Sequence, residues 1–410
     1  MGNTTGRHPI LLISLDAVSD SNVDFLLSLP NFRKLASLGV LHRDVDSLFV
    51  SNTYPIHTSI STGVLPEVHG VYDNTIQEPG SPIEIWRDHK RFIHATTLPE
   101  KAKAKDLRTC AMMYPMTSGE KIMYHFPEIP GKISNTKKAL RLLHYGSLPF
   151  MAHYYMKFGR DLKSHNHRGM DDFITHTATD LLSKDKADLY MLHLLDVDSS
   201  KHKFGATSDE AFSALRRIDE RLGAFYEAFQ EKEKRSGNNS GAIENLDILI
   251  FSDHSCLDVK RAIRPNDLLS EHGISFETAY FHSTHGCCFL HVKPNLTGEE
   301  KESLEAFEEI FLNHPGIKRR LTDEEMKVSG AAAAGFALGY AAEAGTMFGK
   351  KRKGQHGYTL DNDDYKTFYL EIGPNLVAKN EDEPKTPGSI TSGGCILEVG
   401  TKVNRLVESR

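Results

Sequence analysis

The chain has 410 residues, of which 39% are hydrophobic and 25% charged, the composition of an ordinary globular protein. A formal net charge of −6 argues against a dedicated nucleic-acid binder, so we expect no nucleic-acid polymer as a partner. No stretch approaches the roughly 18 apolar residues that span a bilayer, and we therefore expect no membrane partner either.

The cysteines and the N-terminus bear on the compartment. Five scattered cysteines follow neither a disulfide framework nor a zinc-binding spacing, which is typical of reduced thiols. Residues 1–8 lack the apolar core of a signal peptide, so we expect a cytoplasmic protein, with an already cleaved secretory signal as the alternative. The 21 histidines are many for this length, which makes metal or acid–base chemistry worth testing.

The first part of the chain predicts a buried strand, a helix and a Ser/Thr-rich segment. Residues 9–15 form a continuous apolar run that ends at Asp16, the pattern of a strand buried on both faces of a parallel sheet. Residues 26–38 have helical spacing and end at Gly39. Residues 51–63 contain a hydroxyl, Thr53, beside a proline and then a Ser/Thr-rich run that could open a helix.

The remaining chain alternates between strands and helices. An amphipathic helix follows a capping box formed by Thr207 and Glu210, because apolar residues recur behind it at intervals of three and four. Polar residues follow two of the strands: Asp198 lies just beyond one, and Ser252, Asp253 and His254 follow another. The predicted strands cover residues 107–114, 187–195, 246–251 and 368–372, and helices are predicted at 168–183 and 298–312.

This alternation predicts an α/β fold with a mostly parallel central sheet and helices on both faces. Asp16, Asp198 and Asp253 each lie just beyond the carboxyl end of a predicted strand, the edge at which such sheets bind ligands. Three carboxylates at one edge would repel each other unless cations neutralise them. Each aspartate alone is more typical of a helix cap or a turn, so the prediction depends on the set.

Histidines accompany these carboxylates. Asp198 and His202 lie four residues apart, Asp253 and His254 are adjacent, and His356 stands in Gln-His-Gly-Tyr. Carboxylate and imidazole ligands together suit zinc or a similar divalent ion. Each fragment occurs by chance in many proteins, and the specificity lies in their order along the chain.

In that order the chain resembles the alkaline phosphatase superfamily, and within it the type I phosphodiesterase/nucleotide pyrophosphatase family. The resemblance spans residues 13–358 and is specific as a set. It is carried by Ile13-Ser-Leu-Asp16, Ser51-Asn-Thr-Tyr-Pro-Ile-His57, Thr62-Gly63, His69-Gly70 with Asn74, Asp198-Ser-Ser-Lys-His202, Ser252-Asp-His254 and Gln355-His-Gly-Tyr358. It implies an alkaline phosphatase-like fold, and we divide the chain into a catalytic core of residues 1–256 and 350–410 and a smaller inserted lobe of residues 257–349.

The resemblance also implies a site with two divalent metal ions, zinc in the family, with manganese or iron as alternatives. One ion would be held by Asp198, His202 and His356. The other would be held by Asp16, Asp253, His254 and the Thr53 hydroxyl.

The implied chemistry is attack on phosphorus by the Thr53 oxygen, which gives a phosphothreonine intermediate. Asn74 matches the family's loop asparagine, whose amide could donate to a phosphoryl oxygen. Tyr54 and Trp86 are weaker candidates for lining a pocket for a base or another flat group, and packing in the core is the alternative for both.

Three residues depart from the family's usual pattern. Ala17 and Ser255 each stand where the family usually has glycine, and Lys201 replaces a small residue. We expect the metal site to survive these changes, because none of the three is a ligand. Lys201 could bring a positive charge near the substrate, and a solvated loop lysine is the alternative.

The sequence therefore predicts a phosphodiesterase or nucleotide pyrophosphatase that acts on a small-molecule phosphoester. A phosphonoacetate hydrolase-like enzyme, a phosphomonoesterase and a non-catalytic metal- or phosphate-binding relative remain alternatives. A sulfatase is disfavoured, because residues 53–57 contain neither its nucleophile nor its arginine. The oligomeric state and the roles of four histidines stay open: His165, His167, His282 and His285.

Overall fold

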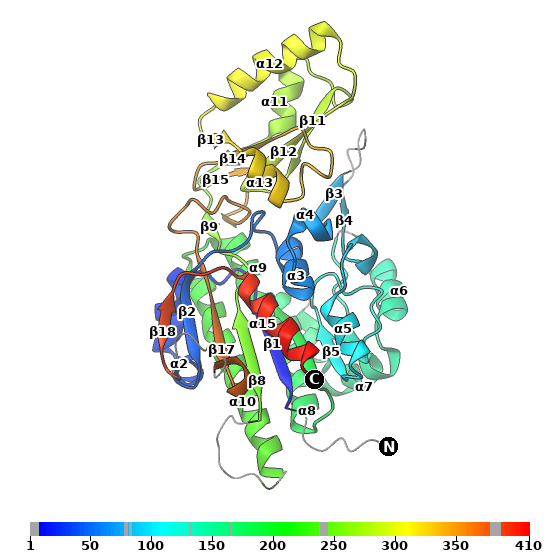
Figure 1. Cartoon of the computed structure of the whole chain (residues 1–410), viewed down its shortest axis with the longest axis vertical. Coiled ribbons are helices and arrows are strands. Elements are labelled where there is room, and N and C mark those ends of the chain that lie inside the picture. Colours follow the sequence, from blue (N-terminus) through cyan, green and yellow to red (C-terminus); the bar gives the residue numbers. More distant parts are fainter. Residues whose placement is uncertain are drawn as a thin grey trace.

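The computed structural model describes residues 8–77, 81, 84–131, 133–164, 166–235, 237, 245–377 and 387–410. Its centre is an eight-stranded sheet in the order β18-β2-β17-β8-β1-β7-β5-β6 (Figure 1). Only the two pairings of β17 are antiparallel, so the expected mostly parallel sheet is confirmed. The strands are β18 Ile390–Ser392, β2 Val40–Val45, β17 Thr367–Ile372, β8 Asp247–Phe251, β1 Ile10–Leu15, β7 Leu189–Leu194, β5 Thr109–Met112 and β6 Tyr124–Phe126.

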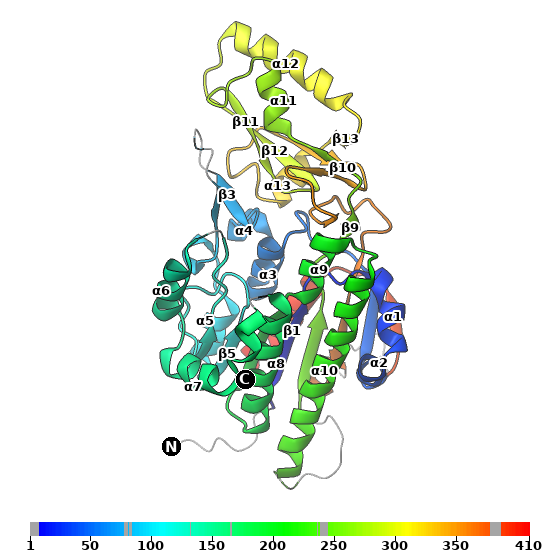
Figure 2. The same cartoon turned by 180° about the vertical axis from the view of Figure 1, so that it is seen from behind.

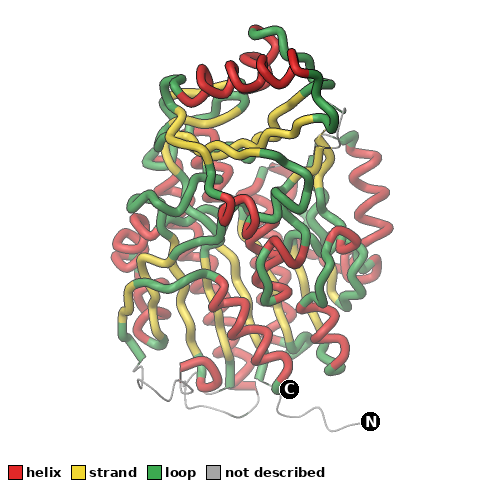
Figure 3. The backbone as a smooth tube through the Cα atoms, turned by 45° about the horizontal axis from the view of Figure 1, so that its top comes forward, coloured by secondary structure: helices red, strands yellow, loops and turns green. Residues whose placement is uncertain are grey.

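Two hydrophobic cores cover the two faces of this sheet, because successive side chains of a strand point to opposite faces. Leu11 and Ile13 of β1 pack into one core with α8 (His167–Ser183) and α10 (Asp209–Arg235), which lie in front of the sheet in Figure 2. Ile10 and Leu12 pack into the other with α3 (Thr53–Thr62) and α15 (Leu397–Glu408), which lie in front of it in Figure 1. Helices on both faces are therefore confirmed, and Figure 3 shows them flanking the strands.

The helices of the core vary from single turns to α10, which has 27 residues. They are α1 Val23–Ser28, α2 Pro30–Ser37, α3 Thr53–Thr62, α4 Pro66–His69, α5 Leu98–Ala104, α6 Asn135–Tyr145, α7 Leu148–Phe158, α8 His167–Ser183, α9 Asp196–Phe204, α10 Asp209–Arg235, α14 Pro374–Val377 and α15 Leu397–Glu408. Short 3₁₀ helices lie at Asp20–Asn22, Lys90–Phe92 and Asp161–Ser164.

Two local predictions are wrong in detail. The single helix predicted at 26–38 is two helices, because Leu29 before Pro30 is extended and Pro30 starts α2. The capping residue of α10 is Ser208, whose Oγ accepts from the Ala211 amide at 3.2 Å. Thr207 instead donates to Asp258 at 2.7 Å.

The lobe, residues 257–349, contains a separate four-stranded sheet in the order β11-β12-β14-β13, seen above the core in Figure 1. Its own hydrophobic core includes Phe281, Phe311 and Tyr340. The boundaries that we drew for the lobe stay predictions. Its elements are β9 Leu257–Asp258, β10 Arg261–Ile263, α11 Pro265–Glu271, β11 Ala279–Ser283, β12 Cys287–Val292, α12 Gly298–Leu312, β13 Ile317–Arg320, α13 Asp323–Val328, β14 Leu338–Ala342 and β15 Thr346–Phe348.

Two short pairings complete the fold at the boundary between core and lobe. β16 Gly354–Gln355 pairs with β9, and β3 Thr75–Gln77 pairs with β4 Glu84–Trp86. Within the described residues, no helix is both long and apolar enough to cross a membrane.

Candidate metal centre

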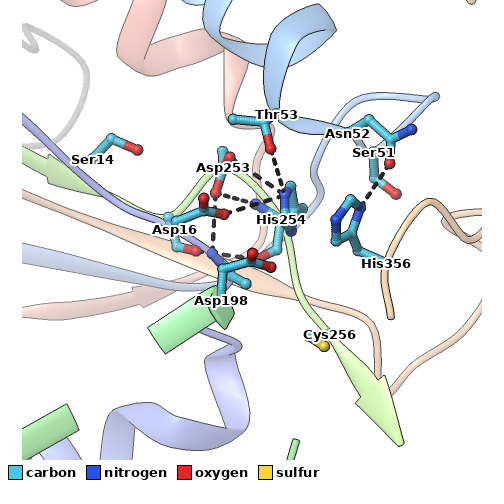
Figure 4. Close-up of polar contacts among 12 residues, drawn as sticks. Ser14, Asp16, Ser51, Asn52, Thr53, Asp198, Asp253, His254, Cys256 and His356 are labelled. Atoms are coloured by element: carbon cyan, nitrogen blue, oxygen red, sulfur yellow. Dashed lines mark hydrogen bonds and ion pairs between the residues drawn. The ribbon is translucent and has the colours of Figure 1, made fainter. Parts of the chain in front are cut away.

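The carboxyl ends of three adjacent parallel strands bring the predicted ligands together. Asp16 follows β1, and Asp253 with His254 follows β8. Asp198 and His202 lie one turn apart in α9, directly after β7. His356 arrives from β16, and Figure 4 shows it beside His254.

The six side chains form two groups. The Asp198 group consists of Asp198, His202 and His356, and the Asp16 group of Asp16, Asp253 and His254. In each group, one ligand atom from every residue lies within 4.8 Å of the others. The His254 and His356 rings stack with centroids 4.0 Å apart, so the two groups are neighbours.

Each of the three histidines has a fixed tautomer. His202 Nδ1 lies 2.8 Å from the Gly354 carbonyl, His254 Nδ1 3.1 Å from the Ser255 carbonyl, and His356 Nδ1 2.7 Å from Asn52 Oδ1. These oxygens only accept hydrogen bonds, so Nδ1 must carry the proton and Nε2 the lone pair. A neutral Nε2 held in this way is what a metal ion requires.

The carboxylates of both groups have buried oxygen atoms that are free to bind a cation. Asp16 Oδ1, Asp198 Oδ1 and Asp253 Oδ2 are buried without a hydrogen-bond partner among the described residues. Burial, Asp198 and Asp253 together raise the pKa of Asp16 well above its usual range. Unpaired buried carboxylates are costly, and a bound cation would remove that cost. The residues present therefore fit two divalent ions.

Burial also favours the neutral form of two of these histidines, His356 and His202. It lowers the pKa of His356 well below its usual range, and the neighbouring His254 and His202 lower it further. Burial lowers the pKa of His202 in the same direction. Neutral imidazoles near pH 7 can bind a metal without first losing a proton.

Thr53 lies at the first position of α3, as the Ser/Thr-rich segment predicted. Its Oγ1 is 3.3 Å from His254 Nε2, so the hydroxyl faces the Asp16 group (Figure 4). Asn52 precedes it in an extended conformation, and α3 ends at Gly63, which has a positive φ of 81°. The helix N-terminus supplies partial positive charge at this point, which favours an anion.

Asn74 is held in one orientation beside Thr53. Its Oδ1 accepts from the Tyr54 amide at 2.8 Å, which leaves the Nδ2 group to donate elsewhere. Tyr54 is buried, its hydroxyl bonds to Glu128 at 2.8 Å, and its ring meets Trp86 edge to face at 5.7 Å. Burial raises the pKa of Glu128 to about 7.

A cavity of about 490 Å³ opens on these groups. Thr53, Asn74 and Trp86 line it together with residues that the sequence left open. His285 lines it from the lobe, with a positive φ of 71° that is uncommon for a non-glycine residue. Arg352 lines it from the basic run before His356.

The other histidines left open have different positions. His167 starts α8, lines the cavity and contacts Ser199. His282 is fully buried and bonds to Asp73 Oδ2 at 2.8 Å. His165 lies outside the described residues.

Both predictions for Lys201, a positive charge near the substrate and a solvated loop lysine, are wrong. The side chain is 1% exposed and does not line the cavity. Its Nζ donates to the Ala17 carbonyl at 2.8 Å, to Asn22 Oδ1 at 2.7 Å and to Ser19 Oγ at 3.2 Å. The reason is helical: one residue before His202, Lys201 points about 100° away from it, toward the segment after β1.

Lys201 and the other two departures from the family pattern meet at one place. Ser255 Oγ lies 2.7 Å from Ser19 Oγ, to which Lys201 also donates. Ala17 has a positive φ of 59° and offers its carbonyl to the same ammonium group. Burial lowers the pKa of Lys201 to about 8.

Two further histidines lie next to the aspartates of the Asp16 group, and the sequence predicted no role for either. His193, inside β7, places Nε2 3.2 Å from Asp16 Oδ2 and Nδ1 3.0 Å from Ser14 Oγ. His57 in α3 also bonds to Ser14 Oγ, at 2.9 Å, and lies 3.6 Å from Asp253 Oδ2. A histidine inside an apolar strand was the available signal, because buried polar groups need partners.

Similarity to known sequences extends over most of the chain. A family model described as type I phosphodiesterase/nucleotide pyrophosphatase matches residues 10–358. The chain is similar to human ectonucleotide pyrophosphatase/phosphodiesterase family member 1, with 24% identity over 255 residues, 60% of this chain and 23% of that protein. Human family member 7 is 22% identical over 396 residues, 92% of this chain and 77% of that protein. The chain spans about a quarter of the length of the first curated relatives that it matches.

Solved structures agree on the fold. Murine ectonucleotide pyrophosphatase/phosphodiesterase 5, as an inactive form in complex with AMP, superposes with a TM-score of 0.67 at 17% identity. The match covers 98% of this chain and 95% of that one. The human form gives a TM-score of 0.66 at 18% identity, over 97% and 94% of the two chains. The expected alkaline phosphatase-like fold is confirmed.

Proposed function

Because the chain belongs to the type I phosphodiesterase/nucleotide pyrophosphatase family, we propose that it is a metal-dependent hydrolase of small phosphodiesters such as nucleotide derivatives. One observation carries this proposal. The Thr53 hydroxyl at the start of α3 lies 3.3 Å from His254 Nε2, beside two groups that each fit a divalent ion. A hydroxyl so placed is suited to attack phosphorus.

Zinc is the ion that we propose for both groups, with manganese or iron as alternatives. Asp198, His202 and His356 would hold one ion, and the Asp16 group with Thr53 Oγ1 the other. Bound there, two divalent ions would lower the pKa of the Thr53 hydroxyl and offset the charge of the phosphoryl group.

The protein's own groups would then act as follows. Thr53 Oγ1 forms a bond to phosphorus while the bond to one ester oxygen breaks. The Thr53 hydroxyl proton ends on that departing oxygen and the alcohol leaves, which gives a phosphothreonine that still carries the second ester group. Asn74 Nδ2 donates to a non-bridging phosphoryl oxygen, because its Oδ1 is already occupied by the Tyr54 amide. Water then attacks the same phosphorus, releases the phosphomonoester and restores the Thr53 hydroxyl.

The cavity supports a substrate with a flat group. Tyr54 and Trp86 both line the cavity that opens on Thr53. Aromatic rings at this position can stack with a nucleobase. The solved relative in complex with AMP supports the same substrate class.

Turnover of bis(p-nitrophenyl) phosphate, p-nitrophenyl phosphate and phosphonoacetate tests the proposal. We expect the diester to be the best substrate, and Thr53→Ala to lose activity by roughly 1,000-fold or more while it still binds zinc. Thr53→Ser is the matched control, because it retains a hydroxyl. Rapid quenching of the reaction with bis(p-nitrophenyl) phosphate, followed by mass spectrometry, should find a p-nitrophenyl phosphoryl group on Thr53. Unchanged turnover by Thr53→Ala would refute the proposal, and preference for the monoester or phosphonoacetate would favour those alternatives.

A further inference from the structure

His356 is held by residues outside its own segment. Its Nδ1 donates to Asn52 Oδ1 at 2.7 Å, and its carbonyl accepts from the Gly286 amide of the lobe at 3.0 Å. The other two histidine ligands, His202 and His254, donate instead to backbone carbonyls of the core. His356 is therefore the one histidine of the two groups whose placement involves the lobe.

The contact through Asn52 continues into the lobe. Asn52 Nδ2 donates to Asp73 Oδ1 at 2.6 Å, and Asp73 Oδ2 lies 2.8 Å from His282 Nε2. All of these side chains are at most 5% exposed, so water does not replace a lost hydrogen bond easily.

Each hydrogen bond in this series has only one possible donor. The Asp73 carboxylate can only accept, so Asn52 Nδ2 and His282 Nε2 both donate to it. With its amide nitrogen committed to Asp73, Asn52 presents its oxygen to His356. The His356 proton is thereby fixed on Nδ1, and its Nε2 lone pair is left for the Asp198 group.

The backbone of the lobe supports the same arrangement. A Cβ on Gly286 would lie 2.4 Å from the Tyr358 nitrogen, and a Cβ on Gly357 would lie 2.1 Å from the Thr284 carbonyl oxygen. Side chains at either position would force the two segments apart. The turn between β11 and β12 thus packs backbone against backbone with the segment that carries His356.

We propose that His282, Asp73 and Asn52 are positioning residues through which the lobe completes the Asp198 group, since the hydrogen bonds of this series lead to His356 and not to Asp16, Asp253 or His254. This inference depends on the metal-binding part of the proposed function. Its consequence is asymmetric: weakening the lobe's contact should impair one metal ion and spare the other. Substitution of a direct hydrogen-bond partner of a metal ligand typically lowers metal affinity 10–100-fold. His282 is two hydrogen bonds beyond the direct partner Asn52, so its substitution should lower the affinity by about 10-fold, the lower end of that range.

The test is best made at His282, because Asn52 directly precedes Thr53 and its substitution would also disturb the proposed nucleophile. His282→Phe removes the donor to Asp73 and retains a ring against Tyr72 and Phe336. His282→Gln retains an N–H donor. His291→Phe is the matched control, because His291 lies in β12 of the same lobe and stacks on Tyr280 at 4.8 Å.

The measurement is calorimetric titration of the chelator-treated chain of 410 residues with Zn²⁺, with melting curves for each variant. We expect two zinc ions in the unaltered chain, an affinity about 10-fold weaker for one of them in His282→Phe, and near-normal affinities in His282→Gln and His291→Phe. In His356→Ala, which lacks the affected ligand, adding His282→Phe should cause no further loss.

Other results would overturn the inference. Unchanged zinc affinities in His282→Phe would refute it while leaving the proposed function intact. Equal weakening of both ions together with a lower melting temperature, and no recovery in His282→Gln, would show a merely structural role. An unaltered chain that binds no zinc would overturn both this inference and the metal dependence of the proposed function.

Discussion

Replacing Lys201 with methionine tests how the buried ammonium group stabilises the segments around the site. Methionine retains most of the side-chain volume but removes three donated hydrogen bonds, to Ala17, Ser19 and Asn22. Ser19 Oγ and Asn22 Oδ1 keep other partners, at Ser255 and at the Ser19 amide. The Ala17 carbonyl is the acceptor most affected.

The magnitude follows from opposing contributions. Hydrogen bonds from a charged donor contribute about 1.5–3 kcal/mol each, whereas the desolvation of a buried ion costs several kcal/mol, which the variant recovers. The net loss in the free energy of unfolding of Lys201→Met should therefore be about 2–4 kcal/mol. Lys203→Met, two residues further along α9 at an exposed position, should change it by less than about 0.5 kcal/mol.

Urea unfolding of both variants in the presence of a chelator is the appropriate assay, because bound metal would mask the difference. If Lys201→Met unfolds at the same urea concentration as Lys203→Met, the ammonium contributes nothing net. The structural reasoning about Lys201 would then be refuted.

Four further outcomes are expected. Asn74→Ala should lower kcat for a diester about 100-fold while zinc binding persists. Asn74→Asp keeps the acceptor for the Tyr54 amide but loses the N–H donor, so its kcat should be as low. An active Asn74→Asp would contradict the donor role. Trp86→Ala should raise KM for a nucleotide diester more than for bis(p-nitrophenyl) phosphate, since Trp86 lines the cavity; equal effects would argue against base stacking. Zinc at 1,000 times its Kd should raise the free energy of unfolding by about 4 kcal/mol per ion, measured by urea unfolding with and without chelator. Burial lowers the pKa of His69 to about 3, so between pH 6.5 and 3 only the unfolded chain binds a proton at this residue. As the pH is lowered through this range, the free energy of unfolding should therefore decrease by about 1.4 kcal/mol per pH unit on account of His69. The free energy of unfolding of His69→Gln should decrease less steeply with falling pH, as measured by urea unfolding.

Much of the fold follows from local patterns in the sequence. The apolar runs that became β1, β7 and β8 are buried on both faces, and such strands are recognisable without any knowledge of their neighbours. The predicted ends of helices were less accurate. Pro30 divides one predicted helix into two, and Ser208 caps the helix for which Thr207 was the expected cap.

The ligands could be predicted for a related reason. In a parallel sheet the carboxyl ends of adjacent strands lie at one edge. Once their strands were identified, Asp16 and Asp253 could therefore be predicted to lie close together. Asp198 and His202 share a helix face by their spacing alone. The order of these motifs along the chain identified the family.

The tertiary structure alone decided what surrounds the ligands. His282 and Asp73 are 209 positions apart, and Asn52 and His356 are 304 apart, so no local pattern could pair them. Lys201 next to a ligand was expected to be solvated or close to substrate, and it is buried against the segment after β1. The physical reason is common to both cases. A backbone pattern determines which strand or helix a residue occupies, whereas the partner of a buried polar group depends on which distant segments pack around it.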